Sequence, residues 1–265
     1  MVGPLPMDAF AALRPGPGAV TDALETAWRE TPAVAQAVQA VLAEARQALT
    51  AVADGAAAIT ITLDQLDAPS QTLLGEVLGE GEVKALIRRP DGGEDRVQES
   101  VMPGLWRVLC DGVQTLEIAE VPSLLRAVMA AQPLGLDIPD LLPDGAMNVK
   151  SVLLELDAAT RAYETTGREV EVNLTLLPMT PVDMEVLDRA IGVGPISIVS
   201  LGYGNCRVDA CARRHLWTVR YYNTEDTQIL NAVFAGDVPV SVRATLEDIG
   251  EAAERLGEIT ASLFH

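Results

Sequence analysis

The chain has 265 residues, with 38 Asp and Glu against 19 Lys and Arg, so its net charge at pH 7 is −19. This charge excludes nucleic acid and anionic membrane surfaces as expected partners, because affinity for phosphate comes mainly from Lys and Arg. Hydrophobic residues make up 49% of the chain, enough for a packed core, so disorder is excluded as the source of the charge.

The first half of the chain is predicted to alternate helices and short strands. Residues 1–30 form a Pro- and Gly-rich arm with a short helix near 22–29. Residues 31–132 form a first repeat, which starts with an amphipathic helix capped by Thr31 and begun by Pro32. The further elements expected in this repeat are a strand at 59–63, a helix at 70–78, strands at 83–89, 96–100, 105–110 and 115–118, and a helix at 122–131.

The second half is predicted to repeat this order. Residues 133–147 are rich in Pro and Gly and are interpreted as a linker, and residues 148–265 form the second repeat. That repeat begins with a helix at 149–165 and an alternating strand at 170–176, and it ends with a helix at 239–263.

Sequence landmarks recur between the halves at nearly constant spacing. Thr62-Leu63 matches Thr175-Leu176 at an offset of 113, as Gly79-x-Gly81 matches Gly192-x-Gly194, and Trp106 matches Trp217 at an offset of 111. The predicted fold class is α+β with two similar repeats. Each repeat would be helix-strand-helix, then a small antiparallel sheet and a C-terminal helix, and the two would pack as a pseudo-twofold. The glycines in each GxG pair are interpreted as a left-handed helix exit and a tight turn.

The reactive side chains are few. Cys110, Cys206 and Cys211 support no disulfide framework, which favours a reducing cytoplasm. The sequence contains no P-loop, G-x-S-x-G or H-E-x-x-H motif, and no apolar stretch predicts membrane insertion. The favoured interpretation of the cysteines is that they are buried or incidental thiols, and two further roles for Cys206 remain open. It would ligate a metal or an iron-sulfur cluster with Cys211 or Cys110, or it would be a nucleophile activated by His215 across a hairpin.

Three neighbouring segments stand out as a candidate binding region. They are G-Y-G-N-C-R at Gly202–Arg207, W-x-V-R-Y-Y-N at Trp217–Asn223, and I-L-N at Ile229–Asn231. A glycine-rich turn beside strands that carry Trp and Tyr is typical of interface hot spots, although a Trp on a strand equally indicates core packing.

With these motifs, the sequence resembles the HupH/HyaF family of accessory proteins for [NiFe]-hydrogenase maturation. In the first half the resemblance rests on L-G-x-G-E-V at Leu78–Val83 and on Q-E-S-V-x-P-G-L-W-R-V at Gln98–Val108. Thr218 departs from the family, which commonly has a second aromatic there. The resemblance implies a cytoplasmic, non-catalytic chaperone without a resident cofactor. It also implies binding to the immature iron-sulfur small subunit, with a thioredoxin-like accessory protein as co-chaperone.

The two hypotheses of function, chaperone and metal carrier, place the site on different residues. As a chaperone, the protein is expected to bind its partner through residues of the shared motifs, namely Gly202, Tyr203, Gly204, Asn205, Cys206, Arg207, Trp217, Tyr221, Asn223, Asn231, Glu99 and Trp106. As an iron-sulfur or metal carrier, it would use the thiolate of Cys206 with Cys211 or Cys110, and a cluster would be held transiently.

Overall fold

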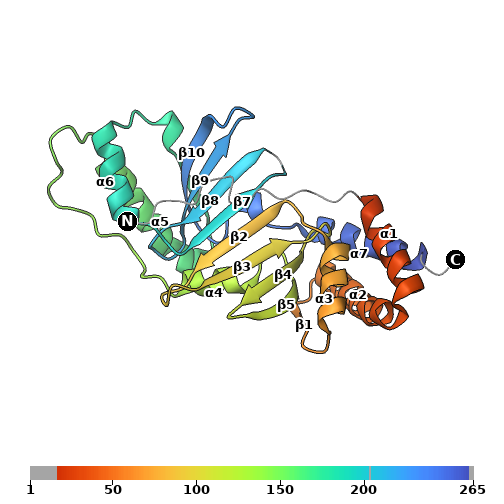
Figure 1. Ribbon diagram of the computed structural model, residues 1–265. Helices are drawn as coiled ribbons and strands as arrows, with labels where there is room; N and C mark the ends of the chain where they lie inside the picture. Colours follow the sequence, from red (N-terminus) through yellow and green to blue (C-terminus); the bar gives the residue numbers. More distant parts are fainter. Residues whose placement is uncertain (1–16, 203, 263–265) are drawn as a thin grey trace. The chain divides into compact units, whose positions relative to one another are not determined.

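The computed structural model describes residues 17–202 and 204–262 (Figure 1). The helices are α1 (Pro17–Glu30), α2 (Pro32–Ala53), α3 (Ala68–Leu78), α4 (Ser123–Ala130), α5 (Val149–Thr166), α6 (Pro181–Ile191) and α7 (Leu246–Ser262), with short 3-10 turns η2 (Leu174–Leu176) and η3 (Val240–Val242). The strands are β1 (Ile59–Thr62), β2 (Val83–Arg88), β3 (Glu94–Glu99), β4 (Leu105–Cys110), β5 (Val113–Ile118), β6 (Val170–Asn173), β7 (Ile196–Ser200), β8 (Asn205–Ala210), β9 (Leu216–Tyr222) and β10 (Gln228–Ala235).

The α+β class and the repeated order of elements agree with the prediction. A helix, a strand, a helix, four strands and a helix follow one another in α2–α4 and again in α5–α7. Most of the predicted arm lies outside the described residues. The described part from Pro17 is the helix α1, which is longer than expected and buries Leu24 and Ala27 in the core. The pseudo-twofold packing of the repeats stays a prediction.

The two halves contain sheets of the same topology. The strand order is β1-β5-β4-β3-β2 in the first and β6-β10-β9-β8-β7 in the second. The pairs β1–β5, β5–β4 and β4–β3 are antiparallel, as are the pairs β6–β10, β10–β9, β9–β8 and β8–β7. The registers also agree, since Ile59 pairs with Ile118 where Val170 pairs with Ala235, and Glu99 with Trp106 where Ala210 pairs with Trp217. The first strands therefore correspond at an offset of 111, and the predicted match of Thr62-Leu63 with Thr175-Leu176 is wrong.

The GxG pairs perform the same task in both halves. Gly79 and Gly192 end α3 and α6 with φ of 56° and 64°, a conformation that favours glycine. A Cβ on Gly81 would lie 2.2 Å from the carbonyl oxygen of Ser100, and one on Gly194 would lie 2.3 Å from that of Cys211. The second glycine is therefore required by close backbone approach, in addition to the predicted tight turn.

The compact units differ from the predicted domains 31–132 and 148–265. Among the described residues, one unit comprises 17–86, 90–123 and 243–262, and the other comprises 87–89 and 124–242. The final helix of each half thus belongs to the unit built mainly from the other half. The predicted linker 133–147 is also packed, because Leu136 is buried in the second core and its N–H donates to Asp157.

The position of α7 has a simple packing cause. Its apolar face includes Ile249 and Leu256, which share one buried cluster with Leu42 and Leu49 of α2. The helix begins at Leu246, later than the predicted 239, because Thr245 and Asp248 cap it, with Thr245 Oγ1 2.6 Å from an Asp248 carboxylate oxygen.

Two other local predictions are corrected. The strand expected at 170–176 ends at Asn173, because the Asn173 side chain accepts a hydrogen bond from the Thr175 N–H and the chain turns into η2. Thr31 does precede α2, but its hydroxyl donates to the Ala27 carbonyl and makes no capping bond to the helix.

Asp183 joins the starts of α5 and α6. It forms a capping box with Thr180 in α6, and its Oδ1 accepts hydrogen bonds from the N–H groups of Met147, Asn148 and Val149 at 2.8 to 3.1 Å. Burial disfavours the charged carboxylate, but the hydrogen bonds from Thr180, Met147 and Val149 outweigh it and lower the pKa to about 2.

Replacement of this carboxylate is expected to destabilise the second half. Asp183→Ala leaves several N–H groups unpaired, so we expect a loss of about 2–4 kcal/mol in the free energy of unfolding at pH 7. Because the pKa of Asp183 is lowered in the folded state, the wild type should lose the stability that this carboxylate contributes as pH falls from about 4 towards 2. Denaturant titration measures both. Glu185→Ala, at an exposed position on the same helix, is the control, and an equal effect of the two changes would contradict the assignment.

Candidate functional site

The three motif segments of the second half converge at one end of its sheet. Ser200 pairs with Cys206, so residues 201–202 and 204 lie beside the start of β8. Tyr222 pairs with Asn205 on one side and with Gln228 on the other, which places the turn 223–227 at the same end. We define the loop end of the second sheet as residues 201–202, 204–205, 222–231 and 173–177.

Hydrogen bonds within the turns keep the loop end in shape. Asn223 closes the β9–β10 hairpin, because its side-chain oxygen accepts from the N–H groups of Glu225 and Thr227 at 2.9 Å and its own N–H donates to the Thr227 carbonyl. Gly204 has φ of 105° and is exposed, like Gly202, whereas Tyr203 lies outside the described residues. Tyr221 and Asn205 are half-buried. The candidate Asn223 is thus a turn-forming residue.

The outer strand of this sheet is shorter than the strand that it covers. β6 pairs only with residues 232–235 of β10, so β10 continues beyond it towards the loop end. At the point where β6 stops, the Thr175 hydroxyl accepts from the Asn231 N–H at 2.8 Å and donates to the Asn231 carbonyl at 3.5 Å. Beyond it, Ile229 is 58% exposed and Leu176 is 80% exposed.

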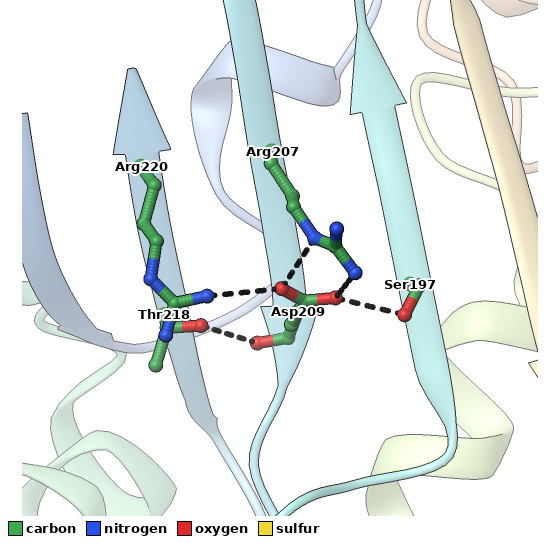
Figure 2. A network of polar contacts seen from close by, with 5 residues as sticks. All are labelled: Ser197, Arg207, Asp209, Thr218 and Arg220. Atoms are coloured by element: carbon green, nitrogen blue, oxygen red, sulfur yellow. Dashed lines mark hydrogen bonds and ion pairs between the residues drawn. The ribbon is translucent and has the colours of Figure 1, made fainter. Parts of the chain in front are cut away.

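A buried polar network lies on the adjoining strands (Figure 2). The guanidinium of Arg207 contacts both carboxylate oxygens of Asp209, at 2.8 and 3.2 Å, and Arg220 of β9 reaches the same carboxylate at 3.2 Å. Ser197 of β7 donates to it at 2.8 Å, and Thr218 donates to the Asp209 backbone carbonyl. The network joins β7, β8 and β9, so Arg207 holds the strands behind the loop end and is itself buried.

Sequence reasoning missed most members of this network. Only Arg207 was a candidate, yet Asp209 lies two residues further along a predicted strand and therefore on the same face. The exposed edge at Ile229 and Leu176 was also missed, because its recognition requires the knowledge that β6 ends at Asn173.

Both candidate tryptophans are core residues. Trp106 and Trp217 are each 1% exposed, and the Trp106 indole N–H donates to the Ala119 carbonyl at 2.8 Å. Trp217 pairs with Ala210, about 15 Å along β9 from the loop end at the strand rise of 3.3 Å per residue. The prediction that these two side chains contact a partner is therefore wrong. Core packing, the alternative prediction for a Trp on a strand, is what the structure shows for both side chains.

Glu99 is a buried acid in the other compact unit. It is 7% exposed, pairs with Trp106 across β3 and β4, and accepts a hydrogen bond from the Gly104 N–H at 3.3 Å. Burial raises the pKa of its carboxyl to about 7, and the Gly104 hydrogen bond only partly opposes this.

Cys206 is a buried residue of strand β8 in the second sheet. It is 2% exposed, and its thiol donates to the Ser241 hydroxyl at 3.7 Å. Burial raises the pKa of Cys206, and it raises the pKa of Cys211 as well. Cys206 and Cys211 are five residues apart along the direction of β8, so their side chains point to opposite faces of the sheet. Cys211 belongs to the core under α5 and α6, and the two thiols therefore do not share a ligand site.

The hairpin does not bring Cys206 and His215 together. Cys206 pairs with Tyr221, whereas His215 precedes β9 at the opposite end of the strand. His215 instead contacts Glu164 at 3.0 Å and lies against Tyr163 in a tilted arrangement, with 4.7 Å between ring centroids. The hypothesis of a Cys206 nucleophile activated by His215 is therefore wrong.

Within residues 17–202 and 204–262, His, Cys, Asp and Glu side chains nowhere gather in threes suitable for a metal ion. Over the same residues, every helix is too short or too polar to cross a bilayer.

Comparison with known proteins decides the family. The model of the HupH hydrogenase expression protein C-terminal conserved region matches residues 35–132 and 146–263, one segment in each half. The chain belongs to the HupH family. Its relatives include the hydrogenase expression/formation protein HoxQ of Cupriavidus necator, 42% identical over 75% of this chain and 72% of the relative. The hydrogenase-1 operon protein HyaF of Escherichia coli is 33% identical over 76% and 72%.

A solved structure of the HupH family also matches. It is the hydrogenase expression protein HupH from Thiobacillus denitrificans, with 25% sequence identity and a TM-score of 0.41. The match covers 43% of this chain and 96% of the other.

The raised pKa of Glu99 predicts that its charged carboxylate lowers the stability of this HupH-family protein at high pH. Its carboxyl binds its proton more tightly in the folded state, so the stability it contributes falls as pH rises from about 4.5 to about 7. We expect Glu99→Gln to raise the free energy of unfolding by about 1–3 kcal/mol at pH 8 and to change it little at pH 5. Urea titration at both pH values tests this, with exposed Glu76→Gln as control. A pH-independent effect would contradict it.

The enclosure of Cys206 predicts slow alkylation. Because only the thiolate reacts, burial and a raised pKa should make iodoacetamide modification of Cys206 at least about tenfold slower than that of half-buried Cys110. Peptide mass spectrometry over a time course distinguishes the two. Reaction of Cys206 at the rate of a free thiol would contradict the described packing.

Proposed function

We propose that this protein is a non-catalytic maturation chaperone for a [NiFe] uptake hydrogenase and acts in the cytoplasm. It binds the immature iron-sulfur small subunit during assembly, with a thioredoxin-like accessory protein as second partner. The binding surface is the loop end of the second sheet. Membership in a family of hydrogenase expression and formation proteins supports the maturation role.

The observation that carries the proposed site is the convergence of the three motif segments. Residues about twenty apart in sequence meet at one sheet end, where the exposed glycines and the Asn223 hairpin face outward from a core fixed by Arg207 and Asp209. A rigid scaffold that presents exposed loops is the common arrangement of binding sites.

Charge supports a basic partner surface. The loop end contains two acidic residues, Glu225 and Asp226, and neither Lys nor Arg. Glu171 on β6 and Glu225 in the hairpin are exposed. Such a field attracts Lys- and Arg-rich segments and makes association sensitive to salt.

The second reading, an iron-sulfur or metal carrier that uses Cys206, has less support. Thiolate ligation requires an accessible sulfur that loses its proton, and Cys206 is buried with a raised pKa. Anaerobic purification with metal analysis decides between the two readings.

The chaperone proposal predicts charge-dependent capture of the precursor. The variant Glu171→Lys with Glu225→Lys is expected to weaken binding of the small-subunit precursor about tenfold or more, because two rim charges are reversed. The measurement is the affinity of each purified variant for surface-bound precursor, determined at low and at moderate salt. Glu155→Lys, exposed on α5 of the same unit, is the control. Undiminished capture by the double variant, or an equal loss in the control, would contradict the proposed surface.

A further inference from the structure

The edge of β10 at the loop end provides a place for one more strand. β6 covers residues 232–235 of β10, whereas β10 itself begins at Gln228. In the first sheet the corresponding strands are closer in length, since β1 has four residues against six in β5, and β10 has eight. The extra length of β10 lies entirely towards the loop end.

Two local features keep this edge separate from the rest of the sheet. The Thr175 hydroxyl occupies both the N–H and the carbonyl of Asn231, so the edge is sealed just where β6 stops. Beyond Asn231, the pairing of β10 with β9 shifts register between Gln228 and Leu230, which leaves Ile229 as an extra residue. Such a bulge redirects side chains, and Ile229 is 58% exposed.

Apolar side chains flank the edge on the β6 side as well. Leu176 and Leu177 follow Thr175 directly, and they are 80% and 38% exposed. Exposed leucine and isoleucine on two segments joined by the Thr175–Asn231 hydrogen bonds form an apolar rim beside main-chain groups of β10. Unprotected strand edges of this kind pair readily with extended chains.

The surroundings select the chemistry of the occupant. Because the loop end carries Glu225 and Asp226 and neither Lys nor Arg, an acidic segment would be repelled here and a basic one attracted. We propose that the client adds an extended segment, with alternating apolar residues and Lys or Arg, to β10 at Gln228–Leu230. Main-chain hydrogen bonds would supply affinity and the rim of Ile229, Leu176 and Leu177 would supply contacts for its apolar side chains. This inference rests on the proposed function and specifies how the client is bound.

Hydrogen exchange of the complex tests the inference. When the small-subunit precursor binds the full chain, amide exchange in 228–230 should slow by about tenfold or more, because new main-chain hydrogen bonds protect it. The variants Ile229→Lys and Leu176→Lys should raise the Kd about tenfold, whereas Leu154→Lys, at a 54% exposed position on α5, should not. A peptide of alternating Val and Lys should compete with the precursor, and one of alternating Val and Glu should not.

The outcomes separate the two proposals. Full binding of the precursor with unchanged exchange in 228–230 would overturn strand addition and leave the chaperone role intact. Full binding by both Lys variants at the edge would do the same. If the precursor does not bind at all, the proposed function fails and the inference fails with it. Circular dichroism of each variant confirms that a lost interaction does not reflect unfolding.

Discussion

The early end of β6 determines what the second sheet presents to a partner. Asn173 accepts from the Thr175 N–H, the chain turns into η2, and β6 therefore has only four residues. Its neighbour β10 continues to Gln228, and among the described residues its part 228–230 has no strand partner on that side. A single side-chain-to-backbone hydrogen bond thus exposes a strand edge and places Leu176 beside it, where a longer β6 would have covered both.

Polar contacts elsewhere in the second half join the elements behind this edge. Asp183 fixes the starts of α5 and α6, and the Arg207–Asp209–Arg220 network fixes β7, β8 and β9 (Figure 2). Binding through a preformed edge costs less conformational entropy than binding through a mobile loop, which is suited to holding an incompletely folded client. The first half has the same topology, but Gln98 stands where Asp209 would be and Leu109 where Arg220 would be, so the network belongs to one half only.

Most of the fold was predictable because its periodicities are local. The helix at 32–53, the strand at 105–110 and the repeated GxG exits follow from apolar spacing and from glycine at positive φ. The exchange of α4 and α7 between compact units was not predictable, because an amphipathic face such as that of Ile249 and Leu256 does not specify which core it covers. At the site, the motifs identified the right region, but burial of Trp217 and Cys206 depends on tertiary packing that a strand pattern leaves open.

The central claim is that the loop end of the second sheet is the surface that contacts the hydrogenase client. Site-specific photo-cross-linking in cells that make the hydrogenase tests it most directly, with a benzophenone side chain at position 229 and, separately, at position 154. Both positions are exposed to a similar extent, 58% and 54%, and they lie on different elements. Cross-links to the small-subunit precursor from position 229 and none from position 154 are the predicted result. Cross-links from position 154 alone would contradict the account.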